Sequence, residues 1–255
     1  MHPLRISIVT YNIWAEERWD FRQEALSRFM TRFEPDIVCL QELRPVSRNL
    51  LDATLIRHRR VEDAFAGWVR QSNIYWRGDL FSEIEHGAED VGIAHEADRR
   101  LFWVRLNVTG LDRSILVATA HFTHQRHPEE RATGQSPRVA QTRQVIANLK
   151  RLNRSGEALF FMGDLNDPVH PPSLLHEAGY VSSFAALGLQ PEPTYKCYPT
   201  AAVAPGALAM TQCIDWIVAS ADARPVSTSV PHFFFDDAAP SDHWPVHAVY
   251  ELPTS

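Results

Sequence analysis

The stretch of residues 159–168, LFFMGDLNDP, constrains the fold of this chain more than any other. Four consecutive apolar residues predict a short strand that is buried on both faces. Gly163 then allows the backbone to turn, and Pro168 stops a return to regular structure. Asp164 and Asn166 are two residues apart, so their side chains lie on the same side of an extended chain. Two interpretations fit this pair equally: a turn stabilised by bonds to backbone amides, or a site at the end of a strand.

Other predicted strands also end in polar side chains. Residues 4–11 precede Asn12, and the apolar residues 37–40 precede Gln41 and Glu42. A helix with apolar residues at every fourth position lies between these strands, and this order is typical of a βαβ unit. Folds built from such units keep their sites at the carboxyl ends of the strands.

The second half of the chain repeats this arrangement. His121 follows a predicted hairpin of residues 101–108 and 114–120, although a lone histidine in that place is more often structural. Asp215 lies inside the apolar run 214–218, and a buried acid needs a charged or hydrogen-bonding partner. Elsewhere we expect amphipathic helices over residues 46–70 and 139–152.

The polar residues at these predicted strand ends form a set with a chemical logic. They are Asn12, Glu42, His121, Asp164, Asn166, Asp215, Asp242 and His243. The oxygen atoms of Glu42, Asp242 and the Asn12 side chain suit Mg²⁺ or Mn²⁺. A zinc site would need histidines or cysteines at short spacing, which the chain lacks. Two histidines with separate acids fit one general acid or base with an orienting partner, and one ligand of a phosphate group.

Composition narrows the classes of protein to which this chain can belong. With 255 residues, 45% hydrophobic and 22% charged, it is an ordinary globular sequence, and we expect a single domain over residues 1–255. A formal charge of −6 argues against an extended basic surface for duplex nucleic acid. Three widely spaced cysteines indicate a reducing compartment. There is no signal-peptide pattern and no transmembrane segment, so we expect a soluble, cytoplasmic protein. The oligomeric state stays open, and a monomer is compatible with the sequence.

Six short motifs, in this order, resemble those of the endonuclease/exonuclease/phosphatase superfamily of deoxyribonuclease-I-like phosphoesterases. They are TYNIW at 10–14, LQE at 40–42, TAHF at 119–122, GDLN at 163–166, IDW at 214–216 and SDH at 241–243. The resemblance implies an α/β fold: a four-layer α/β sandwich, in which two mixed β-sheets pack face to face with helices outside. It also implies a hydrolase of phosphoester bonds that depends on Mg²⁺ or Mn²⁺.

The resemblance also assigns roles to residues of this chain. It implies a metal site with Glu42 as the principal ligand and with Asn12 and Asp242 nearby. It implies that Asp164 and Asn166 position or activate the attacking water and touch the phosphate.

The two histidines take their roles from the same resemblance. His243, held by Asp215, is implied to contact the scissile phosphate, and His121 to bind a phosphate oxygen. Which group takes the proton from water stays open between His243 and Asp164. The family often has a Glu before its middle strand that pairs with the equivalent of His121, whereas this chain has Gln71.

The sequence constrains the identity of the substrate less than it constrains the fold and the reaction. We expect a phosphodiesterase, nuclease or phosphatase acting on a nucleotide, a nucleic acid end or a related phosphoester, and any polymer to be short or single-stranded. Candidate substrate-binding residues are Trp14, Arg18, Arg77 and His124. Trp14 can equally cover the edge of the core. The alternatives are a lipid-headgroup phosphodiesterase like the sphingomyelinases, an inositol phosphatase, and a non-catalytic binding module.

Overall fold

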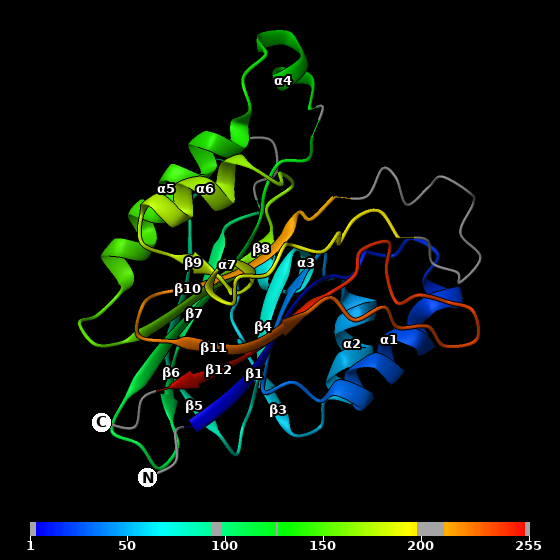
Figure 1. Cartoon of the computed structure of the whole chain (residues 1–255). Helices are drawn as coiled ribbons and strands as arrows, with labels where there is room; N and C mark the ends of the chain where they lie inside the picture. The colour runs from blue at the N-terminus through cyan, green and yellow to red at the C-terminus, as the bar shows by residue number, and fades with distance from the viewer. Residues whose placement is uncertain (1–3, 93–97, 126, 198–211, 253–255) are drawn as a thin grey trace.

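The computed structural model describes residues 4–92, 98–125, 127–197 and 212–252 (Figure 1). Within these ranges the strands form two six-stranded mixed sheets. Across sheet A the order is β11 (Arg224–Ser229), β12 (Val246–Leu252), β1 (Leu4–Asn12), β2 (Ile37–Gln41), β4 (Ser72–Arg77) and β3 (His58–Arg60). Across sheet B it is β5 (Phe81–Glu89), β6 (Leu101–Val108), β7 (Ser114–His121), β8 (Ala158–Asp164), β10 (Asp215–Ala219) and β9 (Val181–Ser182).

Each sheet has one parallel pair near its centre, and its other neighbouring strands are antiparallel. The parallel pairs are β1 with β2 and β7 with β8. A parallel pair needs a long crossover connection, usually helical. Helix α1 (Trp19–Phe33) makes the first crossover, and α4 (Pro128–Thr133) and α5 (Pro137–Leu152) lie on the second. The carboxyl ends of two strands therefore meet at one edge of each sheet.

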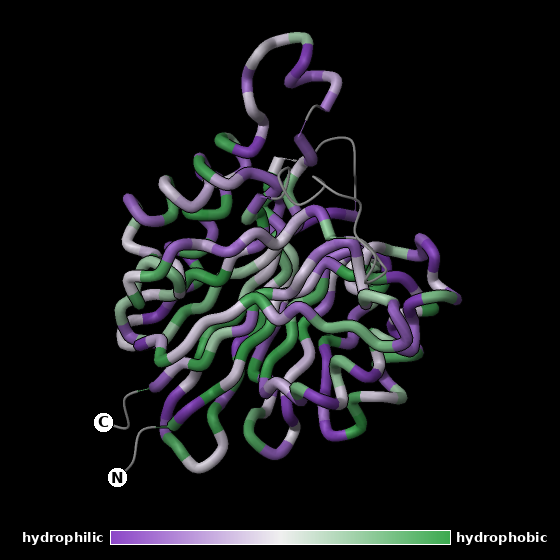
Figure 2. Tube along the Cα trace, turned by 45° about the vertical axis from the view of Figure 1, so that its right-hand side comes forward, coloured by the Kyte–Doolittle hydropathy of each residue, from purple (hydrophilic) through white to green (hydrophobic). Residues whose placement is uncertain are grey.

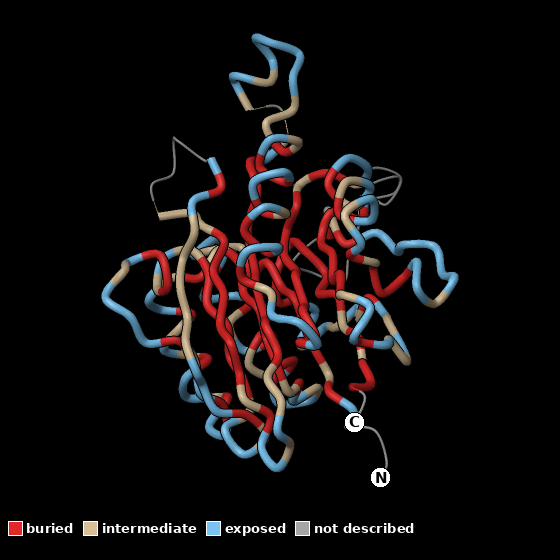
Figure 3. The backbone as a smooth tube through the Cα atoms, turned by 90° about the vertical axis from the view of Figure 1, so that its left-hand side faces the viewer, coloured by how far each residue is buried: buried red, intermediate tan, exposed pale blue. Residues whose placement is uncertain are grey.

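The two sheets pack face to face, with β1 against β8 and β10, and β2 against β7 and β8. Helices α1 and α2 (Pro45–Thr54) cover sheet A, and α5 and α6 (His170–Glu177) cover sheet B (Figure 1). The short helices are α3 (Gly67–Arg70) and α7 (Ser183–Ala186). Helix α4 has no buried residue and projects beyond the sheets (Figure 3). This architecture confirms the four-layer α/β sandwich expected from the resemblance.

The expectation of one helix over residues 46–70 is wrong. Helix α2 ends at Thr54, the chain turns, and His58–Arg60 pairs with β4 as the edge strand of sheet A. The side chain of Arg60 reaches back to Asp52, with Nε 2.9 Å from Oδ1, and this ion pair holds the strand against α2. The expected helix at 139–152 is confirmed as part of α5.

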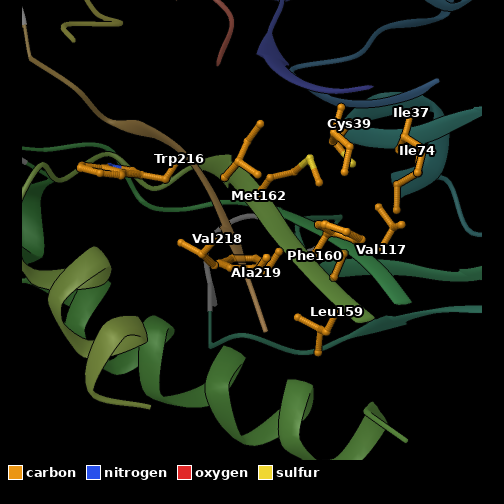
Figure 4. Packing of buried hydrophobic residues seen from close by; sticks show 14 of the residues in the cluster. Ile37, Cys39, Ile74, Val117, Leu159, Phe160, Met162, Trp216, Val218 and Ala219 are labelled. Carbon is orange, nitrogen blue, oxygen red and sulfur yellow. The ribbon is translucent and has the colours of Figure 1, made fainter. Parts of the chain in front are cut away.

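The apolar run of β8 lies at the centre of the core. Phe160 and Met162 point toward Cys39 and Ile74 of sheet A, whereas Leu159 lies on the side of the helices (Figure 4). All five side chains are fully buried. The hydrophobic parts of the chain lie along these central strands, and the hydrophilic parts along the loops (Figure 2). A strand buried on both faces is thus rigidly held, and so is the residue at its end.

Among the helices of the described residues, none is long and apolar enough to cross a membrane.

Candidate active site

The site lies where the parallel pairs of both sheets end. In sheet A, Asn12 stands opposite Gln41. In sheet B, Asp164 stands opposite His121 on one side and Asp215 on the other. The face-to-face packing joins the two edges, because Nδ2 of Asn12 is 3.0 Å from Oδ2 of Asp164. The structure therefore brings together residues that the sequence places far apart.

Gly163 is required for this close approach. Its φ of 153° is rare for residues with a side chain, and a Cβ there would overlap the carbonyl oxygen of Ala120 in β7. Without a side chain at this position, β8 and β7 keep their pairing up to their last residues. Asp164 and His121 consequently face each other, with Oδ2 of Asp164 3.3 Å from Nε2 of His121.

Asn12 connects the two sheets through its side-chain amide. Its Nδ2 donates to Oε1 of Glu42 (3.2 Å) and to Oδ2 of Asp164 (3.0 Å). Its Oδ1 accepts the backbone N–H of Trp14 at 3.0 Å. The role of Asn12 as a metal ligand stays a prediction. Its Oδ1 accepts this backbone donor, and its Nδ2 sets the spacing between the two carboxylates.

Three buried side chains of the site, an acid, an imidazole and a second acid, lie next to one another in that order. Nδ1 of His243 is 2.8 Å from Oδ2 of Asp215, and Nε2 of His243 is 3.8 Å from Oδ2 of Asp164. All three residues are at least 95% buried. Since Asp215 accepts at Nδ1, the imidazole presents Nε2 toward Asp164.

The buried charges of Asp215, His243 and Asp164 shift the pKa values of these groups. Burial lowers the pKa of His243, but the charges of Asp215 and Asp164 outweigh it and raise the pKa well above its usual value. Burial raises the pKa of Asp164, and the nearby charge of Asp215 raises it further. The two acids therefore favour the cationic form of the imidazole, and burial makes Asp164 a stronger base than an ordinary carboxylate.

His121 has the opposite character. Burial lowers the pKa of His121 well below its usual value, and the positive charges of Arg99, His243, His124 and Arg44 lower it further. It is a neutral imidazole whose Nε2 faces Asp164. Within the described residues its buried Nδ1 has no hydrogen-bond partner. The backbone of Gln71 accepts the N–H of Leu43 and donates its own N–H to the carbonyl of Gly67, and among the described residues its side chain makes no hydrogen bond to this ring.

Asn166 stabilises the turn after β8. Its backbone N–H donates to Oδ1 of Asp164 (2.9 Å), and its Nδ2 donates to the carbonyl of Phe122 (3.0 Å). Its φ of 52° is left-handed, which Asn tolerates better than most residues. The turn interpretation of the Asp164–Asn166 pair is therefore confirmed, and the site interpretation stays a prediction that this geometry allows. Asn166 fixes one oxygen of Asp164 and leaves the other to the site.

Two further carboxylates, near Asp215, His243 and Asp164, suit a divalent cation. Glu42 follows β2 in the left-handed region, with a φ of 58°, a strained conformation typical of functional positions. Asp242 is buried, and among the described residues its Oδ1 has no hydrogen-bond partner. Burial raises the pKa of Asp242 to about 6, and the charge of Glu42 contributes to the rise. An orphaned carboxylate oxygen near a second acid fits a hard cation.

A second group of residues can also be considered as metal ligands. Asp164, Asp215 and His243 offer ligand atoms that all lie within 4.8 Å of one another. The hydrogen bond between His243 and Asp215 already explains the closeness of that pair. The partnerless oxygen of Asp242 has no such explanation, so Asp242 with Glu42 stays the candidate metal site predicted from the sequence.

The residues predicted to bind substrate fall into two groups. Trp14 is half-buried beside Asn12, Arg18 is exposed before α1, and His124 is exposed close enough to His121 to lower its pKa. Arg77 is not at the site. It ends β4 beside Asp36, at the start of β2, and Nη2 pairs with Asp79 at 2.5 Å. Because β4 is antiparallel to β2, its last residue lies at the opposite edge of the sheet.

Two residues at the site were not predicted. The ring of Tyr195 lies 4.7 Å from the ring of His243, and it comes from an irregular segment with no periodic pattern to indicate it. Arg22 lies in α1, fully buried, and contacts the loops that carry Asn12 and Asp242. An arginine among the inward-facing positions of an amphipathic helix was the signal for it.

Comparisons with known proteins agree with this geometry. The sequence pattern of the Endonuclease/Exonuclease/phosphatase family matches residues 9–243. A search of curated proteins finds no match.

Several solved structures share the fold over nearly the whole chain. D. rerio TDP2 complexed with single strand DNA product is 18% identical, with a TM-score of 0.77 over 96% of this chain and 98% of that one. A mannosyl-6-phosphatase from Bacteroides thetaiotaomicron is 16% identical, with a TM-score of 0.78 over 96% and 99%. A functionally unknown conserved protein from Enterococcus faecalis is 19% identical, with a TM-score of 0.79 over 97% and 100%. At these identities the likeness establishes the fold.

Proposed function

This chain belongs to the endonuclease/exonuclease/phosphatase family, and from that membership we propose that it is a Mg²⁺- or Mn²⁺-dependent hydrolase of phosphoester bonds. The observation that carries the proposal is the buried chain Asp215–His243–Asp164. A cationic imidazole beside a proton-accepting carboxylate provides both groups that hydrolysis of a phosphoester needs: one that neutralises charge and one that takes a proton.

The roles of the three residues follow from their protonation. His243, held cationic by Asp215, donates from Nε2 to an oxygen of the phosphoryl group and stabilises the negative charge that develops there. Asp164 takes the proton from the attacking water, because His243 is already protonated. Asn12 and Asn166 hold the two carboxylate oxygens of Asp164 in place. The sequence left this proton transfer open between His243 and Asp164, and the protonation states favour Asp164.

We assign the metal to Glu42 and Asp242, with Asn12 orienting Glu42. A bound divalent cation would supply Lewis-acid neutralisation of a phosphate oxygen. The charges of Arg22 and Lys196 also act on Asp242, and they favour its ionised form.

For the substrate we propose a nucleotide or a short or single-stranded nucleic acid end. One protein of similar fold is complexed with single strand DNA product and another is a mannosyl-6-phosphatase, so this fold serves both a nucleic acid ligand and a phosphatase. Trp14 beside Asn12, together with exposed Arg18 and His124, provides one aromatic and two basic groups for a base and its phosphates. A net charge of −6 favours few phosphate contacts.

A panel of phosphoesters assayed with Mg²⁺ and with Mn²⁺ tests this function. The panel holds nucleotides, short single-stranded and duplex oligonucleotides, sugar phosphates, inositol phosphates and sphingomyelin. Glu42→Gln is expected to abolish most turnover without unfolding the protein, because Glu42 ends a strand and is not in the core. The matched control is Glu24→Gln on the exposed face of α1, whose ion pair with Arg28 is of little energetic value.

Chelation of the metal is expected to abolish turnover, and Zn²⁺ alone is not expected to restore it fully. Hydrolysis that continues undiminished in chelator would refute the metal assignment. Turnover of sphingomyelin or of inositol phosphates in preference to nucleotides would replace the proposed substrate class and leave the chemistry intact.

A further inference from the structure

Arg22 is a buried and extensively bonded cation beside the site. It is 0% exposed, and its guanidinium lies 5.4 Å from the ring of Trp14 and 5.3 Å from the ring of Trp19. It makes five hydrogen bonds, all to backbone carbonyls. The acceptors are the carbonyl oxygens of Ile13 (2.7 Å), Trp14 (2.7 Å), Ala15 (2.8 Å), Glu17 (2.6 Å) and Pro240 (2.8 Å).

Four of these carbonyls belong to the loop between β1 and α1, which has an uncommon backbone. Trp14, Ala15 and Arg18 have φ values of 57°, 44° and 49°, and none of them is a glycine. Left-handed residues of this kind are strained and persist only where the surroundings hold them. A fork of five N–H donors can satisfy several carbonyls at once, which a lysine cannot do.

The fifth carbonyl joins this loop to a distant segment. Pro240 comes two residues before Asp242 and three before His243. The hydroxyl of Ser241 adds a second tie, donating to the carbonyl of Asn12 at 2.7 Å. The loop that follows Asn12 and the segment that carries Asp242 and His243 are therefore fastened together around one guanidinium.

The loop held by Arg22 in turn orients the side chain of Asn12. The N–H of Trp14 holds Oδ1 of Asn12, and this bond turns Nδ2 toward Glu42 and Asp164. Among the described residues Arg22 makes no hydrogen bond to a carboxylate. Burial lowers the pKa of Arg22, and the charges of Asp242 and Glu42 act in the opposite direction without outweighing it. Its charge therefore lies near both candidate metal ligands and leaves their oxygens free.

We propose that Arg22 is the positioning residue of the metal and phosphate site, fixing Asn12 from one side and Asp242 and His243 from the other. This inference rests on the proposed function. It assigns Arg22 no contact with the substrate. Outer groups that orient metal ligands typically account for a 10–100-fold effect on metal affinity or activity when they are changed, and we expect about that loss here.

The test compares Arg22→Lys and Arg22→Met with Arg105→Lys. Lysine keeps the charge and loses the fork, whereas methionine keeps the stem between the two indoles and loses every donor. Arg105 is 2% exposed and bonds Glu157 and the carbonyl of Leu152, near the start of β8 and so at the far end of that strand. It provides the same substitution at an equally buried position away from the site.

Three measurements are made below the lowest unfolding temperature of the set. Mn²⁺ affinity is read from the paramagnetic resonance signal of the free ion, kcat from the best phosphoester of the panel, and amide hydrogen exchange from metal-free protein. Both Arg22 variants are expected to lose about 10–100-fold in Mn²⁺ affinity and in kcat, with faster exchange in residues 13–17 and 240–243. Arg105→Lys is expected to lower the melting temperature and change none of the three readouts at the site.

An Arg22→Lys or Arg22→Met protein with wild-type Mn²⁺ affinity and kcat would overturn the inference, even if it melts earlier. Equal losses in Arg105→Lys would also overturn it, since the effect would then be one of general stability. Hydrogen exchange needs neither metal nor substrate. Unchanged exchange in the two segments therefore refutes the role of Arg22, whereas a wild-type protein that hydrolyses no phosphoester refutes the proposed function.

Discussion

Nδ1 of His243 lies 2.8 Å from Oδ2 of Asp215, and the two side chains are 5% and 0% exposed. Asp215 comes from β10 of sheet B, whereas His243 comes from the segment before β12 of sheet A. The pair therefore forms only when the two sheets are packed. The other carboxylate oxygen of Asp215, Oδ1, has no hydrogen-bond partner among the described residues. His243 is therefore the group that compensates this buried carboxylate.

This pair predicts that the stability of the metal-free protein depends on pH. Burial lowers the pKa of His243, but Asp215 and Asp164 outweigh it and raise the pKa to about 10, against about 6.5 in an unfolded chain. The stabilisation is then fully present below about pH 6.5 and is lost as the pH rises toward about 10. With chelator present, the free energy of unfolding in urea should fall between about pH 7 and about pH 9. Asp215→Asn should show a flatter dependence, and parallel curves for the two proteins would contradict the pairing.

Gly163→Ala should destabilise the protein by about 3 kcal/mol or more, because its Cβ would overlap the carbonyl of Ala120 inside a paired sheet. Gly110→Ala is the matched control. Gly110 also has a positive φ, of 81°, but a Cβ there meets nothing within 4 Å, so only about 1 kcal/mol of backbone strain is expected. Equal losses of unfolding free energy in urea would show that the parallel strands do not need the close approach.

Binding of an oligonucleotide should depend only weakly on salt. The charge of −6 and the few basic groups near the site allow few phosphate contacts, and the slope of log affinity against log salt counts those contacts. The measurement is a titration of catalytically inactive Glu42→Gln with a single-stranded oligonucleotide at several salt concentrations. A steep slope on long duplex DNA, of the size expected for about 6–10 contacts, would refute a short or single-stranded substrate.

The fold was predictable because the sequence patterns of several strands indicate where they lie. The apolar run of β8 is buried on both faces, as four consecutive apolar residues require, and β6 was expected at the residues it occupies. The prediction of one helix over residues 46–70 was wrong because a helical pattern cannot reveal a short edge strand. What forms β3 is its pairing with β4 and the bond from Arg60 to Asp52, two contacts that a helical pattern does not encode.

The candidate site was predictable as a set of residues but not as an arrangement. Order along the chain placed Asn12, Asp164 and His243 at one edge, yet it could not show that the oxygen of Asn12 is held by Trp14. Arg77 was misplaced because strand direction, which puts it at the opposite edge, follows from pairing with β2. The place of Arg22 on the inward face of α1 was a readable signal, but its role was missed because its bonds go to backbone carbonyls, which no motif marks.

The turnover of Asp215→Asn tests the central claim most directly. The change keeps the size of the side chain and removes the charge that keeps His243 cationic and in the required tautomer. We expect kcat to fall by roughly 10²–10⁴, by analogy with the comparable change in the serine-protease triad, with an altered pH profile of the residual activity. Asp112→Asn, on the exposed turn between β6 and β7, should change neither quantity. An Asp215→Asn protein that folds normally, keeps near wild-type kcat and retains the wild-type pH profile would show that Asp215 is only a structural acid and that the proposed chain does not operate.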